Sequence, residues 1–512
     1  MFILLAYLIV LVSLTLFQLK DFKNPVFRSG KKVAWWLSGL SLYMHYLSVD
    51  QGQLVTGIIA EHGMSGMWMF WAGWLGIFVI PLVFAPLWRK MDFMTDNQFL
   101  LFRFPGKSGR FLHQFRAIYV GGLVVALALC FNVIGFARIA AIYFDISQQN
   151  ALFLTGGILC LFALKNVFDL KLKMDALHAI LFFTSLVIIV ISLWNLTGSK
   201  EDFFTFFKQN PEKKSLLPTS ENSWFSMFVF LGIQWWSCYL FDGGGPEMAR
   251  FTAVKNTKSA ILTGLLPIAI SFVASFIMMG HILLILGLKS NQVNPEIHYV
   301  DSVFQVIPAA TKPIVLLGFF GMFITTAESL MNWGASFLTI DVVKGNLLPN
   351  LKEKQVQKVS FAMMLFLSLL AVIFAFYVDN LQSLIKLTFS ISAGVAPVYI
   401  LRWIWFRINA WSQLSAMLSS AVFTLLYPSF HTDLPLSQYP MQEARVLVVT
   451  ILTTIIWLLV TYLTPNQSTE VRLKMIPILE SRMSFMKRFA VSISLGILFL
   501  GIVAMSWWWI LG

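Results

Sequence analysis

Apolar residues form long runs along this chain, separated by short polar segments. Since about 20 apolar residues in a helix cross the hydrocarbon core of a bilayer, we predict an all-α polytopic membrane protein with about fourteen spans. None of the loops between them is long enough for a soluble domain. The expected spans are 2–18, 34–60, 66–88, 116–144, 150–165, 174–196, 223–241, 259–288, 313–343, 360–378, 383–401, 409–427, 445–464 and 488–511.

The composition agrees with this pattern. Of the 512 residues, 58% are hydrophobic and 12% are charged, whereas soluble proteins carry about 25% charged residues. The three cysteines lie in apolar segments, which favours packing roles over a disulfide framework. The formal charge of +13 comes from basic residues scattered among short loops, so membrane topology explains it better than a nucleic-acid partner.

The distribution of basic residues predicts the orientation. The first apolar run has no basic residue before it, and the first lysine is Lys20, which is typical of a membrane helix rather than a signal peptide. With the N-terminus outside, seven cytoplasmic segments hold 28 of the 37 Lys and Arg residues. This asymmetry predicts a plasma (cell inner) membrane protein with both termini outside.

Two spans are interrupted by polar residues. Span two turns polar after residue 42, and span seven runs into the segment Gln234–Glu247, which contains three consecutive glycines. Helices broken at corresponding positions of two halves are typical of inverted-repeat transporters. We therefore expect one transporter domain, 1–512, with five-helix repeats at 34–196 and 223–401, an extra helix at 2–18 and three extra helices at 409–511.

Thr325 and Thr326 place two neighbouring hydroxyl groups in the middle of the long span 313–343. Each hydroxyl could bond to the carbonyl four residues earlier in its own helix. Alternatively, the pair could contribute oxygen ligands to an alkali cation, which prefers oxygen. The break in span two would then supply main-chain carbonyls around Met44 and Leu47.

Two acidic residues have alternative interpretations near this pair. Asp175 could form an interfacial ion pair with Lys171 and Lys173, or it could be a buried carboxylate that lends negative charge to the cation site. Glu328 lies one turn beyond the threonines and could be a titratable neighbour of the site or a helix contact.

Asp50 and Gln51 follow the break in span two, and an intramembrane Asp is a functional candidate. Asp50 could instead be structural, paired with Arg138. The seven histidines are dispersed without metal-ligand spacing, and no catalytic triad order, nucleotide loop or zinc motif stands out. We therefore expect no enzymatic activity.

Four segments resemble the sodium/solute symporter family, which includes the sodium-coupled glucose, proline, sialic acid and iodide carriers. Their order and spacing fit across roughly 30–345, and the helix count fits the whole chain. The segments are Trp35–Leu42 continuing to Ser48–Gln51, Met174–His178, Asp242–Lys255, and Thr325–Asn332 with Phe337–Lys344.

The resemblance implies a LeuT-like core of two inverted five-helix repeats and a bound sodium ion. The implied sodium ligands are the hydroxyls of Thr325 and Thr326 and the carbonyls of Met44, Leu47 and Met322, with Asp175 nearby. The implied solute-binding positions are Tyr46, Asp50 and Gln51, opposite Gln234, Trp235, Asp242 and Glu247 of the second broken span.

The chain departs from the family pattern at several of these positions. Ala249 stands where the family usually has Gln, and His178 replaces Gln after Asp175. The bulky run Met44–Tyr46 stands where small or amide residues are common. The sodium site is therefore expected to be retained and the solute pocket reshaped, so no particular solute is implied.

The sequence thus predicts sodium-coupled symport of a small organic solute by alternating access, with Na+ as the coupling ion. A transporter-like membrane sensor and a proton-coupled symporter are the alternatives, and an integral membrane transferase is disfavoured. The expected partners are the solute and the lipid bilayer, and a monomer is one option for the oligomeric state.

Overall fold

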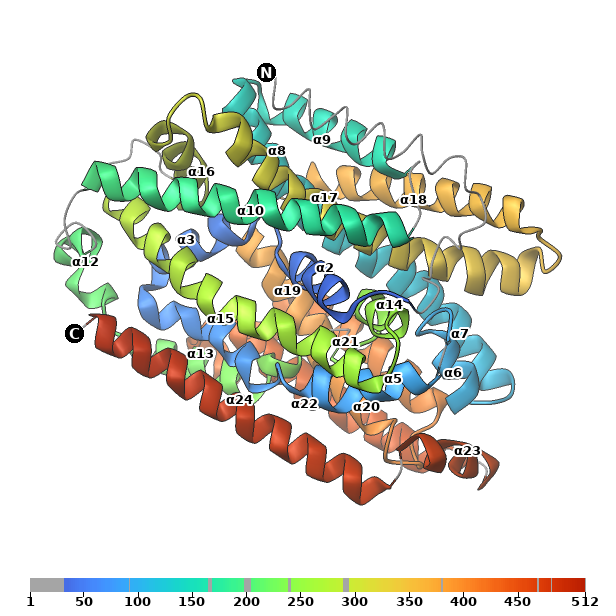
Figure 1. Ribbon diagram of the computed structural model, residues 1–512. Coiled ribbons are helices and arrows are strands. Elements are labelled where there is room, and N and C mark those ends of the chain that lie inside the picture. The colour runs from blue at the N-terminus through green and yellow to red at the C-terminus, as the bar shows by residue number, and fades with distance from the viewer. Residues whose placement is uncertain are drawn as a thin grey trace. The chain divides into compact units, whose positions relative to one another are not determined.

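The computed structural model describes residues 32–91, 93–163, 168–197, 204–237, 241–288, 294–378, 381–466, 469–479 and 481–511, and the expected helix 2–18 lies outside them. Helices make up nearly all of these ranges (Figure 1). Their only β-type pairing is an isolated parallel bridge between Val33 and Val254. The all-α prediction is confirmed.

Eight helices within the described ranges are long and apolar enough to cross a membrane. The structure extends several of the predicted spans, because the polar residues at their ends continue the helix. The eight are Met64–Met91, Lys107–Phe144, Lys171–Leu196, Thr257–Gly287, Lys312–Leu347, Glu353–Ala375, Met441–Leu463 and Arg482–Leu511.

The chain forms two units that alternate along the sequence. Of the described residues, the first unit comprises 32–61 and those that lie within 117–211 and 249–378. Its main helices are α2 (Trp35–Tyr46), α3 (Gln51–His62), α8 (Val125–Phe144), α9 (Gln148–Ala163), α10 (Phe168–Thr197), α15 (Thr257–Gly287), α16 (Pro295–Val306), α17 (Lys312–Ser336) and α18 (Glu353–Ala375).

Helix α17 lies at the centre of the first unit. It packs along α10 (Figure 1) and also contacts α2, α8 and α18. A π-helical segment, Phe337–Leu347, continues α17, and a shorter one, Tyr119–Val124, precedes α8. Of the most apolar part of the Lys312–Leu347 helix, 83% is buried. Polar residues on α17 therefore face protein and need hydrogen-bond partners there.

The second unit comprises His62–Arg116, Glu212–Met248 and Asn380–Gly512. Helix α14 (Gly245–Ala253) crosses the boundary between the two units. The principal helices of the second unit are α5 (Ala85–Met91), α6 (Gln98–Arg103), α7 (Lys107–Ile118), α13 (Glu221–Gly232), α19 (Leu381–Ala393), α20 (Ala396–Leu401), α21 (Ala410–Phe430), α22 (Met441–Leu463), α23 (Thr469–Leu479) and α24 (Arg482–Leu511).

Aromatic side chains form the core of the second unit. The ring of Trp403 stacks on Phe99 with a centroid distance of 4.5 Å and meets Trp88 edge-on at 5.1 Å. Both arrangements are favourable for aromatic quadrupoles. They hold α5 and α6 against the segment that follows α20.

The predicted break in span two is present. Helix α2 ends at Tyr46, Leu47 is extended with φ −79° and ψ 100°, and α3 begins at Gln51. The Ser48 hydroxyl donates to the Asp50 carboxylate, and short polar side chains of this kind compete with helical hydrogen bonding. Local side-chain chemistry therefore supports the interruption.

The predicted break in span seven is also present. Helix α13 ends at Gly232, a short 3-10 turn covers Gln234–Trp236, and α14 begins at Gly245. Gly243 and Gly245 have φ values of 66° and 57°. Residues other than glycine rarely adopt this conformation, because their Cβ makes it unfavourable. The assignment of two five-helix repeats to these breaks remains a prediction.

We predict that Gly135→Ala destabilises the protein by about 1–3 kcal/mol, because it overpacks the contact between α8 and the first break. A β-carbon at Gly135 would lie 2.8 Å from the Cβ of Asp50 and 3.0 Å from its main-chain nitrogen. The apparent melting temperature of the detergent-solubilised protein measures this effect. Gly157→Ala, where a β-carbon meets no atom within 4 Å, is the control; equal melting temperatures for the two variants contradict the prediction.

Candidate sodium and solute sites

The hydroxyl of Thr326 on α17 faces the end of α2. Its Oγ1 lies 3.5 Å from the carbonyl oxygen of Met44, 3.3 Å from that of His45 and 3.1 Å from that of Leu47. Thr326 is 7% exposed, so these oxygens are held within protein. The structure therefore brings together Thr326 and two of the three predicted carbonyl positions.

This cluster contains more acceptors than hydrogen bonding alone requires. A hydroxyl has one proton to donate, whereas three carbonyl oxygens surround that of Thr326. The carbonyls are available because the last turn of any helix leaves its C=O groups without intrahelical donors. Convergent oxygens with surplus lone pairs are a suitable environment for a hard cation.

The spacing of the oxygens also suits such an ion. A hard cation of the size of Ca2+, with ligands about 2.3–2.6 Å away, has octahedral neighbours about 3.3–3.7 Å apart. Sodium has nearly the same ionic radius. The separations of 3.1–3.5 Å from Thr326 Oγ1 to the carbonyl oxygens overlap this range.

The neighbouring hydroxyl of Thr325 has a different partner. Its Oγ1 lies 2.9 Å from Nδ1 of His178 on α10. The main-chain carbonyl of Thr325 accepts from Ser329 Oγ at 2.7 Å. The hydrogen bonds of both threonine hydroxyls therefore reach other helices, in contrast to the alternative of bonding back to their own. Met322, the third predicted carbonyl position, lies one turn earlier on α17.

Asp175 is completely buried and lies beside two cations. Its Oδ2 is 2.8 Å from Lys171 Nζ and 3.7 Å from Arg250 Nη2, and it accepts from the hydroxyl of Ser41. The ion pair with Lys171 considered as an alternative is confirmed. This pair is buried in protein, since Lys171 is only 6% exposed, whereas Lys173 is exposed.

Arg250 on α14 extends this network. Its Nε donates to Ser41 Oγ at 2.9 Å, and its Nη2 donates to Ser329 Oγ at 3.0 Å. Sequence reasoning did not assign Arg250, Ser41 or Ser329 to the site. Arg250 was nevertheless part of a motif that carries the family resemblance, and this was the available signal.

The predicted solute positions of the first unit surround the first break. Tyr46 is 44% exposed, the carboxylate of Asp50 accepts from Ser48, and Gln51 begins α3. Arg138, the alternative partner of Asp50, forms an ion pair with Glu296 at 2.5 Å between Nη1 and Oε2. The break therefore exposes an aromatic ring and contains an acidic side chain.

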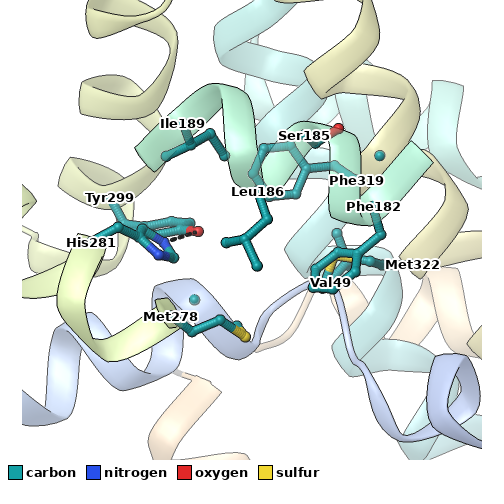
Figure 2. A pocket seen from close by; sticks show the side chains of 12 residues that line it. Val49, Phe182, Ser185, Leu186, Ile189, Met278, His281, Tyr299, Phe319 and Met322 are labelled. Carbon is teal, nitrogen blue, oxygen red and sulfur yellow. Dashed lines mark hydrogen bonds between the residues drawn. The ribbon is translucent and has the colours of Figure 1, made fainter. Parts of the chain in front are cut away.

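A small cavity lies beside this break in the first unit (Figure 2). Val49, Met322 and Leu186 line it together with His281 and Tyr299, whose Nε2 and hydroxyl oxygen are 3.2 Å apart. Its volume is about 20 Å³. A cavity needs about 10–15 Å³ to hold a single water, so this cavity is too small for an organic solute.

The predicted solute positions of the second unit have structural partners. Gln234 Nε2 donates to the carbonyl of Met69 at 2.7 Å, and the ring of Trp235 packs on Trp236 and Phe241. Glu247 is buried in the first turn of α14.

Asp242 is the most strongly held of these residues. Its carboxylate accepts from Arg402 Nη2 at 2.5 Å and from Trp403 Nε1 at 3.1 Å, while its main-chain carbonyl accepts from Trp88 Nε1 at 2.5 Å. These contacts support the aromatic core of the unit. Solute binding by Gln234, Trp235, Asp242 and Glu247 remains a prediction.

The broken helix, the central α17 and the apolar spans define a helical membrane transporter, and comparison with known proteins agrees. Residues 26–420 match the model of the sodium:solute symporter family. A sodium/glucose cotransporter of Vibrio parahaemolyticus is 19% identical over 473 residues, covering 84% of this chain and 85% of the relative. The chain belongs to the sodium:solute symporter family.

Solved structures show the same fold. A Na+-coupled sialic acid symporter in a substrate-bound, outward-open state has a TM-score of 0.71 at 17% identity, covering 91% of this chain and 98% of that one. A nucleobase-cation-symport-1 family transporter in a closed conformation has a TM-score of 0.52 at 13% identity, covering 88% and 98%. The predicted LeuT-like fold is confirmed.

Family membership gives the general activity. The protein is an integral membrane symporter that couples the transport of a small solute to Na+. Its family and structural relatives are transporters rather than enzymes, as the sequence predicted.

We predict that Arg402→Met destabilises the protein by about 3–5 kcal/mol, because it leaves the buried Asp242 carboxylate without its cation. The double variant Arg402→Met, Asp242→Asn should recover much of the loss, since the uncompensated charge is gone. Apparent melting temperatures measure both effects, and Arg407→Met, which removes a less buried guanidinium from the same segment, is the control. A stable Asp242→Asn variant with weakened solute binding would instead support the binding role.

Proposed function

We propose that the coupling Na+ binds between the end of α2 and α17. Its ligands are the hydroxyl of Thr326 and the main-chain carbonyls of Met44, His45 and Leu47. The observation that carries this proposal is the convergence of three carbonyl oxygens within 3.5 Å of one hydroxyl. Carbonyl and hydroxyl oxygens are hard ligands that suit an alkali cation.

The positions of these ligands explain how an ion can drive a conformational cycle. Because the carbonyls belong to a broken helix and the hydroxyl belongs to α17, a bound ion stabilises states in which the two segments are adjacent. A ligand shifts a conformational equilibrium only through its different affinity for the two states. Sodium binding at this position therefore favours one state of an alternating-access cycle.

Three further residues complete the proposed site. Thr325 and the carbonyl of Met322 belong to the same face of α17 as Thr326, and Asp175 is the acidic residue that we place beside them. The hydrogen bond between Thr325 and His178 links this face to α10. Proton coupling is the alternative, with Glu328 as the titratable group.

We propose that the solute is a small polar organic molecule and that Tyr46, Asp50 and Gln51 of the first broken helix contribute to its binding. Gln234, Trp235, Asp242 and Glu247 of the second broken helix are the further proposed binding residues, in repeats that we place at 34–196 and 223–401. The relatives named for glucose and sialic acid make sugars and sugar acids the first candidates. The plasma membrane, with both termini outside, is the proposed location.

We predict that Thr326→Ala raises the Na+ concentration for half-saturation at least about tenfold, a loss of about 1.4 kcal/mol. Binding of radioactive Na+ to the purified protein measures it. Thr155→Ala is the matched control, because that buried hydroxyl only donates to the carbonyl of Ala151 in its own helix. The double variant Thr325→Ala, Thr326→Ala should abolish sodium-driven uptake, and full uptake in that variant refutes the assigned site.

We predict that Gln51→Ala raises the solute KM several-fold and leaves Na+ binding within about twofold of the wild type, because Gln51 is assigned to the solute and not to the ion.

The solute is first identified by an uptake screen. Uptake into proteoliposomes is measured with and without a Na+ gradient, across sugars, sialic acids, amino acids and carboxylates. Binding without transport for every solute would favour the sensor alternative. Uptake driven equally by a proton gradient would favour proton coupling.

A further inference from the structure

The ammonium group of Lys171 occupies a position that a metal cation could take. Its Nζ lies 2.8 Å from Oδ2 of Asp175 and 3.4 Å from the main-chain carbonyl oxygen of Thr325. A carboxylate oxygen and a carbonyl oxygen are the ligands of hard cations. Lys171 is 6% exposed and Asp175 is fully buried, so solvent screens this arrangement little.

This ammonium group is also close to the proposed ion. Thr325 and Thr326 are consecutive, and bond lengths alone place the Thr326 hydroxyl within about 8 Å of the Lys171 ammonium. At that distance two unit charges in a protein interior change a binding constant by about tenfold or more.

We propose that Lys171 is a tethered cation that masks Asp175 and thereby sets the affinity of the neighbouring site for Na+. The inference rests on the Na+ site proposed above at Thr326. With Lys171 in place, the carboxylate of Asp175 is already neutralised, and Na+ is bound mainly by uncharged oxygens. Without Lys171, Asp175 attracts a cation from solution.

The surrounding charges give the direction of the effect. Lys171 and Arg250 are the cations of the cluster, while Asp175 and Glu328, which acts electrostatically on Lys171, are its anions. This set is balanced, and removing Lys171 leaves one excess negative charge beside the ion. Such a charge favours Na+. Arg250 compensates Asp175 less closely, because its nearest nitrogen is 3.7 Å away.

The test measures equilibrium binding of radioactive Na+ to the purified full-length protein without solute. We expect Lys171→Met to lower the Na+ concentration for half-saturation about tenfold. Lys173→Met is the matched control, because it removes an exposed lysine two residues away on the same helix. For Lys171→Arg, which keeps the charge, the Na+ concentration for half-saturation should remain within about threefold of the wild-type value.

The dependence on Asp175 separates masking from a general effect on stability. In the double variant Lys171→Met, Asp175→Asn, the Na+ concentration for half-saturation should return to within about threefold of the wild-type value. Asp175→Asn alone should weaken Na+ binding about tenfold, because it leaves the ammonium unpaired beside the site. The comparison of Asp175→Asn with the double variant isolates the effect of Lys171 even if Lys171→Met alone does not fold.

The outcomes distinguish the two proposals. If Thr326→Ala weakens Na+ binding but Lys171→Met binds like Lys173→Met, the sodium site stands and the role of Lys171 is refuted. A gain in Lys171→Met that persists in the double variant also overturns the masking of Asp175. If Thr326→Ala binds Na+ like the wild type, the proposed sodium site itself is wrong.

Discussion

The structure of the first unit depends on the satisfaction of main-chain carbonyl groups where α2 ends. In a membrane-spanning segment, an interrupted helix requires partners from protein, water or ions, because lipid supplies none. Here one hydroxyl of α17 meets three carbonyl oxygens, and this contact places α2 against the most enclosed helix of the unit. The close approach of Gly135 on α8 to Asp50 holds the other side of the break. The interruption is therefore a supported element of the fold.

In both units a buried carboxylate is paired with at least one buried cation, but the two units use different arrangements. In the first, Asp175 on α10 pairs with Lys171 of the same helix and with Arg250 of α14, and it accepts a hydrogen bond from Ser41 of α2, so three helices meet at this carboxylate. In the second, Asp242 joins the segment before α14 to Arg402 and Trp403 near α20. Removing one member of such a pair costs more than the pair contributes, because it leaves an uncompensated charge behind. Each set of pairs therefore holds together the segments of its own unit.

Local polarity made much of this architecture predictable. The breaks at residues 47–50 and near Gly243 and Gly245 are marked by Ser, Asp and Gly within apolar runs, and the Thr325–Thr326 pair is conspicuous for the same reason. Long-range pairing was not predictable. Arg138 binds Glu296, 158 residues away, and Arg402 binds Asp242, 160 residues away. No local pattern indicates which distant helix supplies the partner, so Arg138 and Asp242 could be singled out while their partners could not.

In the proposed sodium site, the oxygens that surround Thr326 are uncharged, which limits how tightly they can hold an ion. A carboxylate ligand adds a full opposing charge, whereas carbonyls and hydroxyls contribute only dipoles. A symporter must release its coupling ion in each cycle, and an ion held too strongly in every conformation shifts no equilibrium. A dipolar cage drawn from two helices has affinity only while those helices are together. In the proposed site, the pairing of Asp175 with Lys171 and Arg250 keeps its negative charge from holding the ion directly.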